Sequence, residues 1–387
     1  MNNFIVVVLD GVGVGELPDA DRYKDIGSDT LGNMAKVLGG LKLPNLEQFG
    51  LGNLHKIEGI APQKTPLASF GKMAESSIGK DSTTGHWELG GLRIDEEFPL
   101  YPDGFPEEVI SKFLKLTELK GILGNKAASG TEIIKELGEE HLRTGYPIVY
   151  TSADSVFQIA WHEDVFGLEK LYEICKIARE EVLINEHSVG RIIARPFIGE
   201  PGKFERTTNR KDFAVEPPSD TILNVLQKAG INTVGVGKIN DLFSYSGIDV
   251  NEITKSNLKG IKKIIECQNK YKDSFIFANL VDFDVYFGHR NDPQGFHKAL
   301  QEFDEHLPEI MESLDETDVL LLTADHGNDP TTTSTDHSRE YVPLLFYRKG
   351  RSGKDLGIRN TFADVAQTIA DFFKVTNNLK GTSFLNE

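Results

Sequence analysis

Residues 4–10 read "FIVVVLD", a run of six apolar residues that ends in an aspartate. The run is too short to cross a membrane and lacks the small-residue end of a secretion signal, so it predicts a buried β-strand. Further runs of this kind are "TVGVGK" (233–238), "FIFANLVDFD" (275–284), "VLLLTADHG" (319–327) and "VPLLFY" (342–347). Such runs, rich in Val and Ile, are typical of parallel strands that are covered on both faces.

Helical patterns alternate with these strands. In residues 298–314, "KALQEFDEHLPEIMESL", apolar residues recur every three or four positions. A second apolar stripe runs through "TFADVAQTIADFFKV" (361–375), where Thr361 is expected to be the N-cap. Alternating strands and helices predict an α/β fold, with a mainly parallel sheet flanked by helices on both faces.

Two proline-rich stretches interrupt this order, "FPLYPDGFP" at 98–106 and "AVEPPSD" at 214–220. Strand and helix signals are mixed between them. We therefore expect a discontinuous core domain of residues 1–97 and 218–387, with a smaller α+β domain of residues 98–217 inserted as a cap.

Composition restricts the possible partners. The 387 residues include 42 Lys and Arg against 59 Asp and Glu, a net charge of −17, which argues against non-specific binding of nucleic acid. No apolar run is long enough to span a membrane. Cys175 and Cys267 lie far apart and form no metal-binding pair, so we expect reduced thiols and a cytoplasmic location.

Acidic residues end three of the predicted strands, and histidines follow in two of the same loops. Since open α/β sheets bind ligands beyond the carboxyl ends of their strands, these side chains are expected to gather at one edge. Carboxylates with imidazoles suit divalent Mn or Zn, and roughly six such ligands suffice for two ions that act on a phosphoryl group. The eight candidates for these ligands are Asp10, Asp282, Asp284, His289, Asp325, His326, Asp336 and His337.

A row of hydroxyl groups lies in "GKDSTTGHWE" (79–88), at Ser82, Thr83 and Thr84. Taken alone, this stretch is an ordinary solvated turn, because Ser, Thr, Asp and Gly are common turn residues. If the stretch lies beside a two-metal site, one of its hydroxyl groups could be a nucleophile, since a hydroxyl coordinated to a metal can attack phosphorus. The residues by themselves leave open which hydroxyl acts.

With these motifs in view, the chain resembles the prokaryotic phosphopentomutases of the alkaline phosphatase superfamily over essentially its whole length. The motifs that carry the resemblance are "LDGVGVGELPDA", "GSDTLGNMA", "GKDSTTGHWE", "GNKAASGTEII", "VYTSADSV", "GRIIARPF", "LVDFDVYFGHRNDPQG", "TADHGNDPTTTSTDHSREYVPLL" and "GTSFLNE". The resemblance implies an alkaline phosphatase-like core that carries a cap domain.

The resemblance also implies two metal sites. One ion would be held by Asp284, His289 and His337, and the other by Asp10, Asp325 and His326. It leaves Asp282 as a structural residue or as one that supports a metal ligand.

The nucleophile position of the family aligns with Ser82, where the family typically has threonine. Serine can perform the same chemistry, with one methyl group less to fix its rotamer. Thr83 therefore remains an alternative to Ser82 as the phosphorylated residue.

The cap residues implied to bind substrate are Asp154, Arg191 and Arg206, together with Lys238 at the end of the "TVGVGK" strand. The ordinary alternative is that these are solvated surface residues. His86 stays unassigned. No role is expected for the other histidines, which are His55, His141, His162, His187, His297 and His306.

The implied function is that of an isomerase of nucleoside and pentose phosphate metabolism. It would interconvert ribose 1-phosphate, and 2-deoxyribose 1-phosphate, with the 5-phosphate through a phosphoserine and a 1,5-bisphosphate. The cap would close to exclude water. Two Mn²⁺ ions are expected, with Mg²⁺ or Zn²⁺ as alternatives, and a sugar bisphosphate as activator.

Two other functions fit part of the evidence. A metal-dependent phosphohydrolase would use the same metal ligands, whereas the motifs "TSADSV" and "GRIIARPF" favour the mutase. A non-catalytic protein that binds sugar phosphate or metal would need no activated hydroxyl. The expected partners are small pentose phosphates, with no obligate protein partner.

Overall fold

The computed structural model describes residues 2–152 and 155–387, which form two compact units. The larger unit comprises Met1–Asp95 and Pro217–Glu387, and the smaller one comprises Glu96–Glu216. Each unit is described by itself. Asp154, one of the predicted substrate-binding residues, lies outside the described residues.

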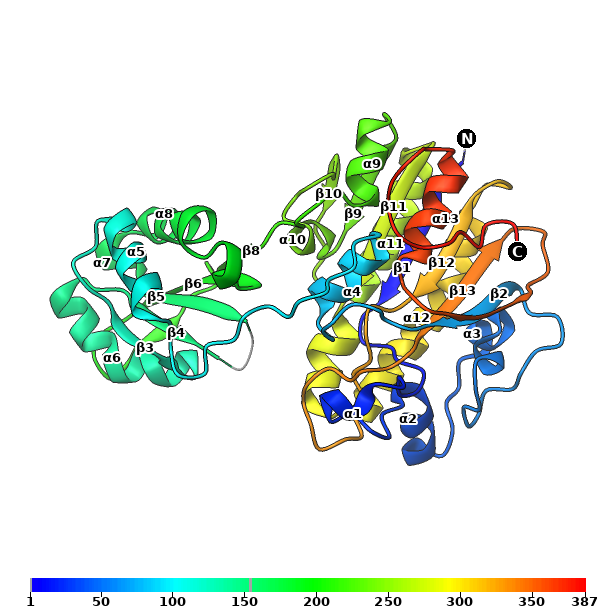
Figure 1. The fold of residues 1–387 in the computed structure, drawn as a ribbon. Coiled ribbons are helices and arrows are strands. Elements are labelled where there is room, and N and C mark those ends of the chain that lie inside the picture. The colour runs from blue at the N-terminus through cyan, green and yellow to red at the C-terminus, as the bar shows by residue number, and fades with distance from the viewer. Residues whose placement is uncertain (1, 153–154) are drawn as a thin grey trace. The chain divides into compact units, whose positions relative to one another are not determined.

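An eight-stranded sheet forms the centre of the larger unit, in the order β10-β9-β11-β1-β12-β13-β2-β14 (Figure 1). β1 lies near the middle and pairs in parallel with both β11 and β12. The strands are β1 (Phe4–Leu9), β2 (Ala68–Met73), β9 (Asn232–Val236), β10 (Val250–Glu252), β11 (Ser274–Leu280), β12 (Val319–Thr323), β13 (Val342–Arg348) and β14 (Asp355–Arg359).

Helices cover both faces of this sheet. On one side α12 packs against α2, α3 and α11, and on the other α13 packs against α4 and α9. The helices of this unit are α1 (Ala20–Tyr23), α2 (Thr30–Leu38), α3 (Pro44–Phe49), α4 (Ser82–Leu89), α9 (Ile222–Lys228), α10 (Ile239–Leu242), α11 (Asn257–Lys270), α12 (Pro293–Glu312) and α13 (Asp364–Phe373). Every residue of β1, β11 and β12 is buried, as expected for strands between two helical layers. The predicted α/β fold with a mainly parallel sheet is confirmed.

Two details of the prediction are wrong. The run at 342–347 was expected to be a parallel strand, but β13 pairs antiparallel with β12 and β2. No crossover helix separates β12 from β13, so the chain turns back from the end of β12 and enters β13 in the opposite direction. Thr361 is not an N-cap, because α13 begins at Asp364 and the Thr361 hydroxyl donates to Glu88 Oε1 at 2.7 Å.

The smaller unit is built on a mixed sheet in the order β3-β4-β5-β6-β7, with β8 also paired to β6. Its strands are β3 (Leu123–Ala127), β4 (Ile148–Thr151), β5 (Val156–His162), β6 (Arg191–Ile198), β7 (Glu205–Arg206) and β8 (Lys211–Ala214). Its helices are α5 (Glu107–Thr117), α6 (Gly130–Thr144), α7 (Glu163–Phe166) and α8 (Leu168–Ile177). One apolar core includes residues of α5 and α8, and a second includes residues of α6, so both faces of the sheet carry packed helices.

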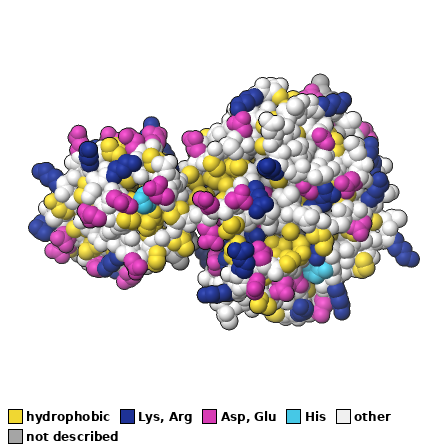
Figure 2. Space-filling view, in the orientation of Figure 1, with side chains coloured by type: hydrophobic (Ala, Val, Ile, Leu, Met, Phe, Trp, Pro, Cys, Tyr) yellow, Lys and Arg dark blue, Asp and Glu magenta, His cyan; other side chains and the backbone are white. Residues whose placement is uncertain are grey.

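Three further features concern the surface, the cysteines and the helix lengths. Acidic and basic side chains lie interspersed over the face drawn in Figure 2. Both cysteines are free and buried. Among the described residues, the helices are all too short or too polar to cross a membrane. The cytoplasmic location stays a prediction.

Candidate active site

Four of the predicted metal ligands follow three neighbouring strands of the large sheet. Asp10 comes directly after β1, Asp284 lies in a helical turn after β11, and Asp325 and His326 follow β12. β11 and β12 both pair in parallel with β1, so their carboxyl ends meet at one edge.

The first cluster consists of Asp10, Asp325 and His326, all of them buried. His326 Nε2 lies 3.5 Å from Asp10 Oδ1 and 3.4 Å from Asp325 Oδ2. One potential ligand atom from each residue lies within 4.8 Å of the others. Three such donors can surround one divalent ion.

The second cluster is centred on Asp284. Its Oδ2 lies 3.1 Å from His289 Nε2, and its Oδ1 lies 3.4 Å from His337 Nε2. The two histidine Nε2 atoms are 3.2 Å apart. The ring of His337 stacks on that of His326 with centroids 3.8 Å apart, so the two clusters adjoin.

The electrostatics of the clusters fit bound cations. Asp10 Oδ1 is buried without a hydrogen-bond partner among the described residues, whereas Asp325 Oδ2 lies 3.1 Å from His86 Nδ1. Burial raises the pKa of Asp10 well above its ordinary value, and the neighbouring carboxylates of Asp325 and Asp284 raise it further. Three carboxylates gathered away from water need positive charge beside them, and oxygen and imidazole donors suit Mn²⁺ or Zn²⁺.

Ser82 is the first residue of α4, so its backbone is fixed by the start of that helix. The N-cap residue Asp81 accepts hydrogen bonds from the amides of Thr83 and Thr84, and it also accepts the Thr84 hydroxyl at 2.5 Å. Ser82 Oγ lies 3.1 Å from His326 Nε2, within the first cluster. The Thr84 hydroxyl is thus occupied by the cap, whereas the Ser82 hydroxyl faces a predicted metal ligand.

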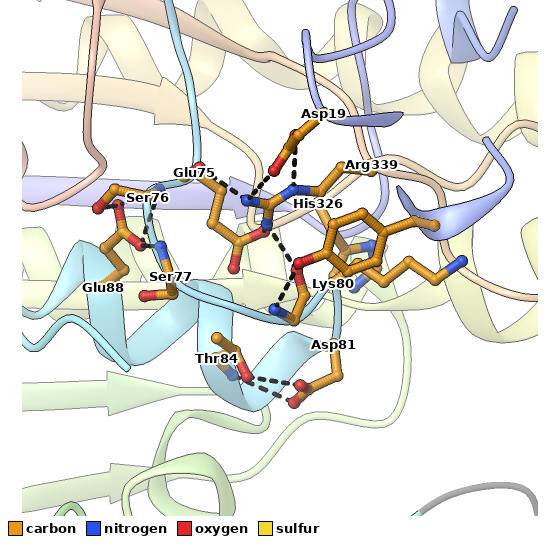
Figure 3. Close-up of polar contacts among 12 residues, drawn as sticks. Asp19, Glu75, Ser76, Ser77, Lys80, Asp81, Thr84, Glu88, His326 and Arg339 are labelled. Atoms are coloured by element: carbon orange, nitrogen blue, oxygen red, sulfur yellow. Dashed lines mark hydrogen bonds and ion pairs between the residues drawn. The ribbon is translucent and has the colours of Figure 1, made fainter. Parts of the chain in front are cut away.

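Arg339 holds the segment that leads to Ser82 (Figure 3). Its side chain is 3% exposed and contacts Glu75 Oε2 at 2.7 Å and both carboxylate oxygens of Asp19. It also donates to the carbonyl oxygens of Glu75 and Gly79, at 3.0 and 2.6 Å. Arg339 comes two residues after His337, so it connects the metal-ligand loop with the nucleophile segment.

Glu88 anchors the same segment from inside α4 (Figure 3). The fully buried carboxylate accepts the amides of Ser76 and Ser77, and that of Phe362 from the α13 side. With these donors the hydrogen-bonding needs of the buried Glu88 carboxylate are met. The same hydrogen bonds fix the position of α4 relative to the segments that donate them.

Sequence reasoning left His86 unassigned and missed Asn279. His86 Nδ1 lies 2.8 Å from the carbonyl oxygen of Ser82 and 3.1 Å from Asp325 Oδ2. Asn279 donates to Asp10 Oδ2 at 2.9 Å and lies 3.1 Å from His86 Nε2. These side chains lie behind the first cluster and orient its carboxylates. The position of Asn279 one residue before the end of β11 was the only signal.

Other predicted residues are not members of the two clusters. Asp282 Oδ2 accepts the amide of Asn257 at the start of α11, in line with the structural role expected for it. Lys238 lies between β9 and α10, and its charge acts on Asp10. Arg191 and Arg206 belong to the smaller unit, in β6 and β7, and Arg191 lies 3.8 Å from Asp212 Oδ2.

Comparison with known proteins shows the family. Residues 2–377 match the metalloenzyme superfamily. The chain is 57% identical over 387 residues to a phosphopentomutase of Dictyoglomus thermophilum, covering 100% of this chain and 98% of that protein. It is 56% identical over 388 residues, with the same coverage, to a phosphopentomutase of Caldanaerobacter subterraneus subsp. tengcongensis.

A solved structure supports the fold alone. The PH0037 protein from Pyrococcus horikoshii superposes with a TM-score of 0.50 at 14% identity, over 98% of this chain and 99% of that one. With relatives at more than half identity over the full length, the chain belongs to the phosphopentomutase family within the metalloenzyme superfamily.

Proposed function

We propose that the protein interconverts ribose 1-phosphate, and 2-deoxyribose 1-phosphate, with the corresponding 5-phosphate through a phosphorylated Ser82. Membership of the family makes the chain an isomerase that acts on pentose phosphates. The observation that carries the mechanism is the 3.1 Å separation of Ser82 Oγ from His326 Nε2, inside a buried cluster of Asp and His.

The two clusters would hold two divalent ions, Mn²⁺ by preference, with Mg²⁺ and Zn²⁺ as alternatives. When bound, such ions supply positive charge that neutralises phosphoryl oxygens and lowers the pKa of a neighbouring hydroxyl. One ion would be held by Asp10, Asp325 and His326, and the other by Asp284, His289 and His337.

Ser82 would carry the phosphate at the start of each cycle. A sugar hydroxyl attacks phosphorus, the bond between phosphorus and Ser82 Oγ breaks, and a 1,5-bisphosphate forms. After the bisphosphate reorients, Ser82 Oγ attacks its other phosphate and releases the isomerised monophosphate. The N-terminus of α4 favours negative charge at Ser82, and Arg339 and Glu88 keep the segment in place.

The substrate would be held by residues outside the two clusters. We propose that Arg191 and Arg206 bind phosphate oxygens, since guanidinium groups pair well with phosphate. Lys238 and Asp154 would contact the same substrate. A sugar bisphosphate would load the first phosphate onto Ser82.

Replacing Ser82 tests this proposal directly. In Ser82→Ala we expect loss of mutase activity and of covalent phosphate, because the proposed oxygen that bonds to phosphorus, Ser82 Oγ, is removed. Intact-protein mass and peptide mapping of residues 79–88, after incubation with a pentose 1,5-bisphosphate, measure the phosphate. Thr83→Ala is the matched control and should keep both; a phosphate that remains in Ser82→Ala and disappears in Thr83→Ala would move the nucleophile to Thr83.

The same assay separates the alternative functions. A phosphohydrolase would release inorganic phosphate from the pentose phosphate without forming the isomer, since water would be the acceptor. A non-catalytic binding protein would take up no covalent phosphate and turn over nothing. Isomer formation without stoichiometric release of phosphate supports the mutase.

A further inference from the structure

The glycine-rich segment after β1 has no part in the proposed function. It reads "DGVGVGE" over residues 10–16. A glycine-rich turn after a strand can hold a phosphate where a helix begins directly behind it, but here the next helix, α1, begins only at Ala20. A protein carboxylate lies against these glycines instead. A Cβ built on Gly13 would lie 2.5 Å from Glu340 Cδ, and one built on Gly327 would lie 2.6 Å from the same atom.

Glu340 is a buried carboxylate that accepts hydrogen bonds at both oxygens. Its Oε1 accepts the hydroxyl groups of Thr30 and Ser338, at 2.8 and 2.6 Å. Its Oε2 accepts the amides of Thr30 and Gly15, at 2.8 and 3.3 Å. The residue is 2% exposed, so these protein donors take the place of water around the carboxylate and fix its position.

Thr30 connects Glu340 with Asn328. Because the Thr30 hydroxyl donates its proton to Glu340, its oxygen is left to accept a further hydrogen bond. That oxygen accepts the amide of Asn328 at 3.1 Å, and the same amide also donates to the carbonyl oxygen of Gly11 at 2.9 Å. The backbone of Asn328 is therefore held both by the start of α2 and by the residue that follows Asp10.

The side chain of Asn328 contacts the second cluster. Its Nδ2 donates to Asp284 Oδ1 at 2.6 Å, and the residue is 1% exposed. A Cβ built on Gly288, the residue before His289, would lie 2.5 Å from the same Nδ2. The amide of Asn328 thus contacts one predicted metal ligand and packs against the backbone beside another.

This contact restricts how Asp284 can meet an ion. A carboxylate that accepts a short hydrogen bond at one oxygen cannot rotate freely, so the direction of its other lone pairs is defined. The second oxygen of Asp284, Oδ2, lies 3.1 Å from His289 Nε2, on the side of the predicted ligands. Side chains that orient metal ligands in this way typically contribute 10- to 100-fold to metal affinity.

We propose that Asn328 is a positioning residue of the second metal site, and that its side-chain amide fixes the carboxylate of Asp284 for a divalent ion. Thr30, itself held by Glu340, keeps Asn328 in place for this role. The second metal site rests on the proposed function, whereas the hydrogen bonds around Asn328 do not.

Chelator competition on the full-length, Mn²⁺-loaded protein tests the role of Asn328, with the electron paramagnetic resonance signal of the released ion as the measurement. Asn328→Leu has a side chain of similar size without the amide. We expect it to weaken the ion of the second cluster about 10- to 100-fold and to leave the other ion unchanged. His289→Ala identifies the ion concerned, because His289 belongs to the second cluster alone.

Two outcomes would overturn the inference. One is wild-type affinity for both ions in Asn328→Leu, and the other is a loss confined to the ion that His289→Ala retains. Asn328→Ser, with a smaller side chain, is measured in the same way and decides the question where Asn328→Leu does not fold.

A pair of substitutions at Thr30 separates positioning from folding. Thr30→Val removes the hydroxyl and keeps the shape of the side chain, so the Asn328 amide loses an acceptor, and we expect a several-fold weaker second ion. Thr30→Ser keeps the hydroxyl and should retain wild-type affinity. Equal affinities in Thr30→Val and Thr30→Ser would overturn the part of the inference that concerns Thr30.

Asn3→Leu is the matched control for a buried asparagine. Asn3 is 0% exposed and donates from Nδ2 to the carbonyl oxygens of Gln268 and Tyr271, at the opposite end of β1 from Asp10. We expect Asn3→Leu to lower thermal stability without changing the affinity for either ion. Equal losses of Mn²⁺ affinity in Asn3→Leu and Asn328→Leu would make Asn328 a merely structural residue and overturn the inference.

The turnover of ribose 5-phosphate by the wild-type protein is measured alongside, so that the two proposals fail separately. A wild-type protein that holds two ions, with the second weakened in Asn328→Leu, but that isomerises no pentose phosphate contradicts only the proposed function. Normal turnover together with unchanged Mn²⁺ affinity in the Asn328 variants contradicts only the positioning role.

Discussion

At the scale of single residues, His141 shows how hydrogen bonds fix a protonation state. The buried ring lies with Nδ1 2.6 Å from the carbonyl oxygen of Tyr146, and its Nε2 accepts the amide of His162 at 2.9 Å. Since Nε2 is an acceptor, the ring must be neutral with its proton on Nδ1. Burial lowers the pKa of His141 from 6.5 to about 4.

We predict that this histidine makes the smaller unit sensitive to acid. The folded pKa is below the unfolded one, so its contribution to stability is present above pH 6.5 and is lost as the pH falls towards 4. At roughly 1.4 kcal/mol per pH unit the loss amounts to at most about 3 kcal/mol. Urea unfolding of wild type and His141→Gln between pH 7 and pH 4 measures it, and parallel pH profiles of the two proteins would contradict the prediction.

Arg191 carries a second prediction at this scale. If it binds a phosphate oxygen, Arg191→Ala should lower kcat/KM for ribose 5-phosphate about 10- to 100-fold, the range for a lost charge-assisted hydrogen bond. Metal content should stay unchanged, because every residue of the two clusters lies in the larger unit. Metal analysis and steady-state kinetics are compared with Arg143→Ala, and equal losses of metal and activity would make Arg191 a structural residue.

Single residues also show what a sequence can reveal about a site. The gathering of Asp10, Asp325 and His326 was predictable because each lies within three residues of the end of an apolar strand, and strand ends are where such sites form. Arg339 and Glu75 were not predictable, since their 2.7 Å ion pair joins positions 264 residues apart. Nothing in the sequence around either residue indicates that it pairs with the other.

At the scale of elements, the segment between β2 and α4 decides where the nucleophile lies. Residues 74–81 have no regular secondary structure, and their carbonyl oxygens at Glu75 and Gly79 are held by one guanidinium group, that of Arg339. The Arg339 guanidinium also lies over the ring of Tyr23, 4.8 Å from its centroid. The rigidity of this loop therefore depends on Arg339, together with Glu88, which accepts the amides of Ser76 and Ser77.

We therefore predict that Arg339→Met destabilises the protein by about 3–5 kcal/mol, because Glu75 is left as a buried charge without a partner. Phosphorylation of Ser82 should slow even at temperatures where the variant is folded, since the segment loses both of its carbonyl contacts. Thermal unfolding and the rate of phosphate uptake are measured together, with the exposed Arg351→Met as control. Wild-type phosphate uptake in folded Arg339→Met would show that the contact is only structural.

Helices and strands were predicted well where the apolar pattern of the segment itself determines them. They were predicted less well where a contact with another segment determines the strand direction or the helix cap. β1, β11 and β12 lie where continuous apolar runs placed them. The direction of β13 depends on the loop that carries His337, which apolar patterning does not encode. Likewise Thr361 has the residue type of an N-cap, but Glu88 takes up its hydroxyl.

At the scale of the whole molecule, negative charge is concentrated where the metals are expected. Besides the net charge of −17, three buried carboxylates, from Asp10, Asp284 and Asp325, repel one another at the edge of the large sheet. Cations that bind only the folded protein stabilise it by RT ln(1 + [L]/Kd), about 2.7 kcal/mol at one hundred times Kd. This stabilisation belongs to the larger unit, because the smaller unit contains none of the six predicted ligands.

The last prediction follows from that separation. Removing metal with a chelator should speed hydrogen exchange of β1, β11 and β12 by up to about 100-fold, the factor that corresponds to 2.7 kcal/mol, while β5 and β6 exchange as before. Asp325→Asn should give the same pattern and lose one or both of two ions per chain, whereas the exposed Asp371→Asn should behave as wild type. Equal loss of protection in both units would mean that the metals stabilise the chain as a single cooperative body. Full mutase activity after complete removal of metal by a chelator would contradict the two-metal mechanism.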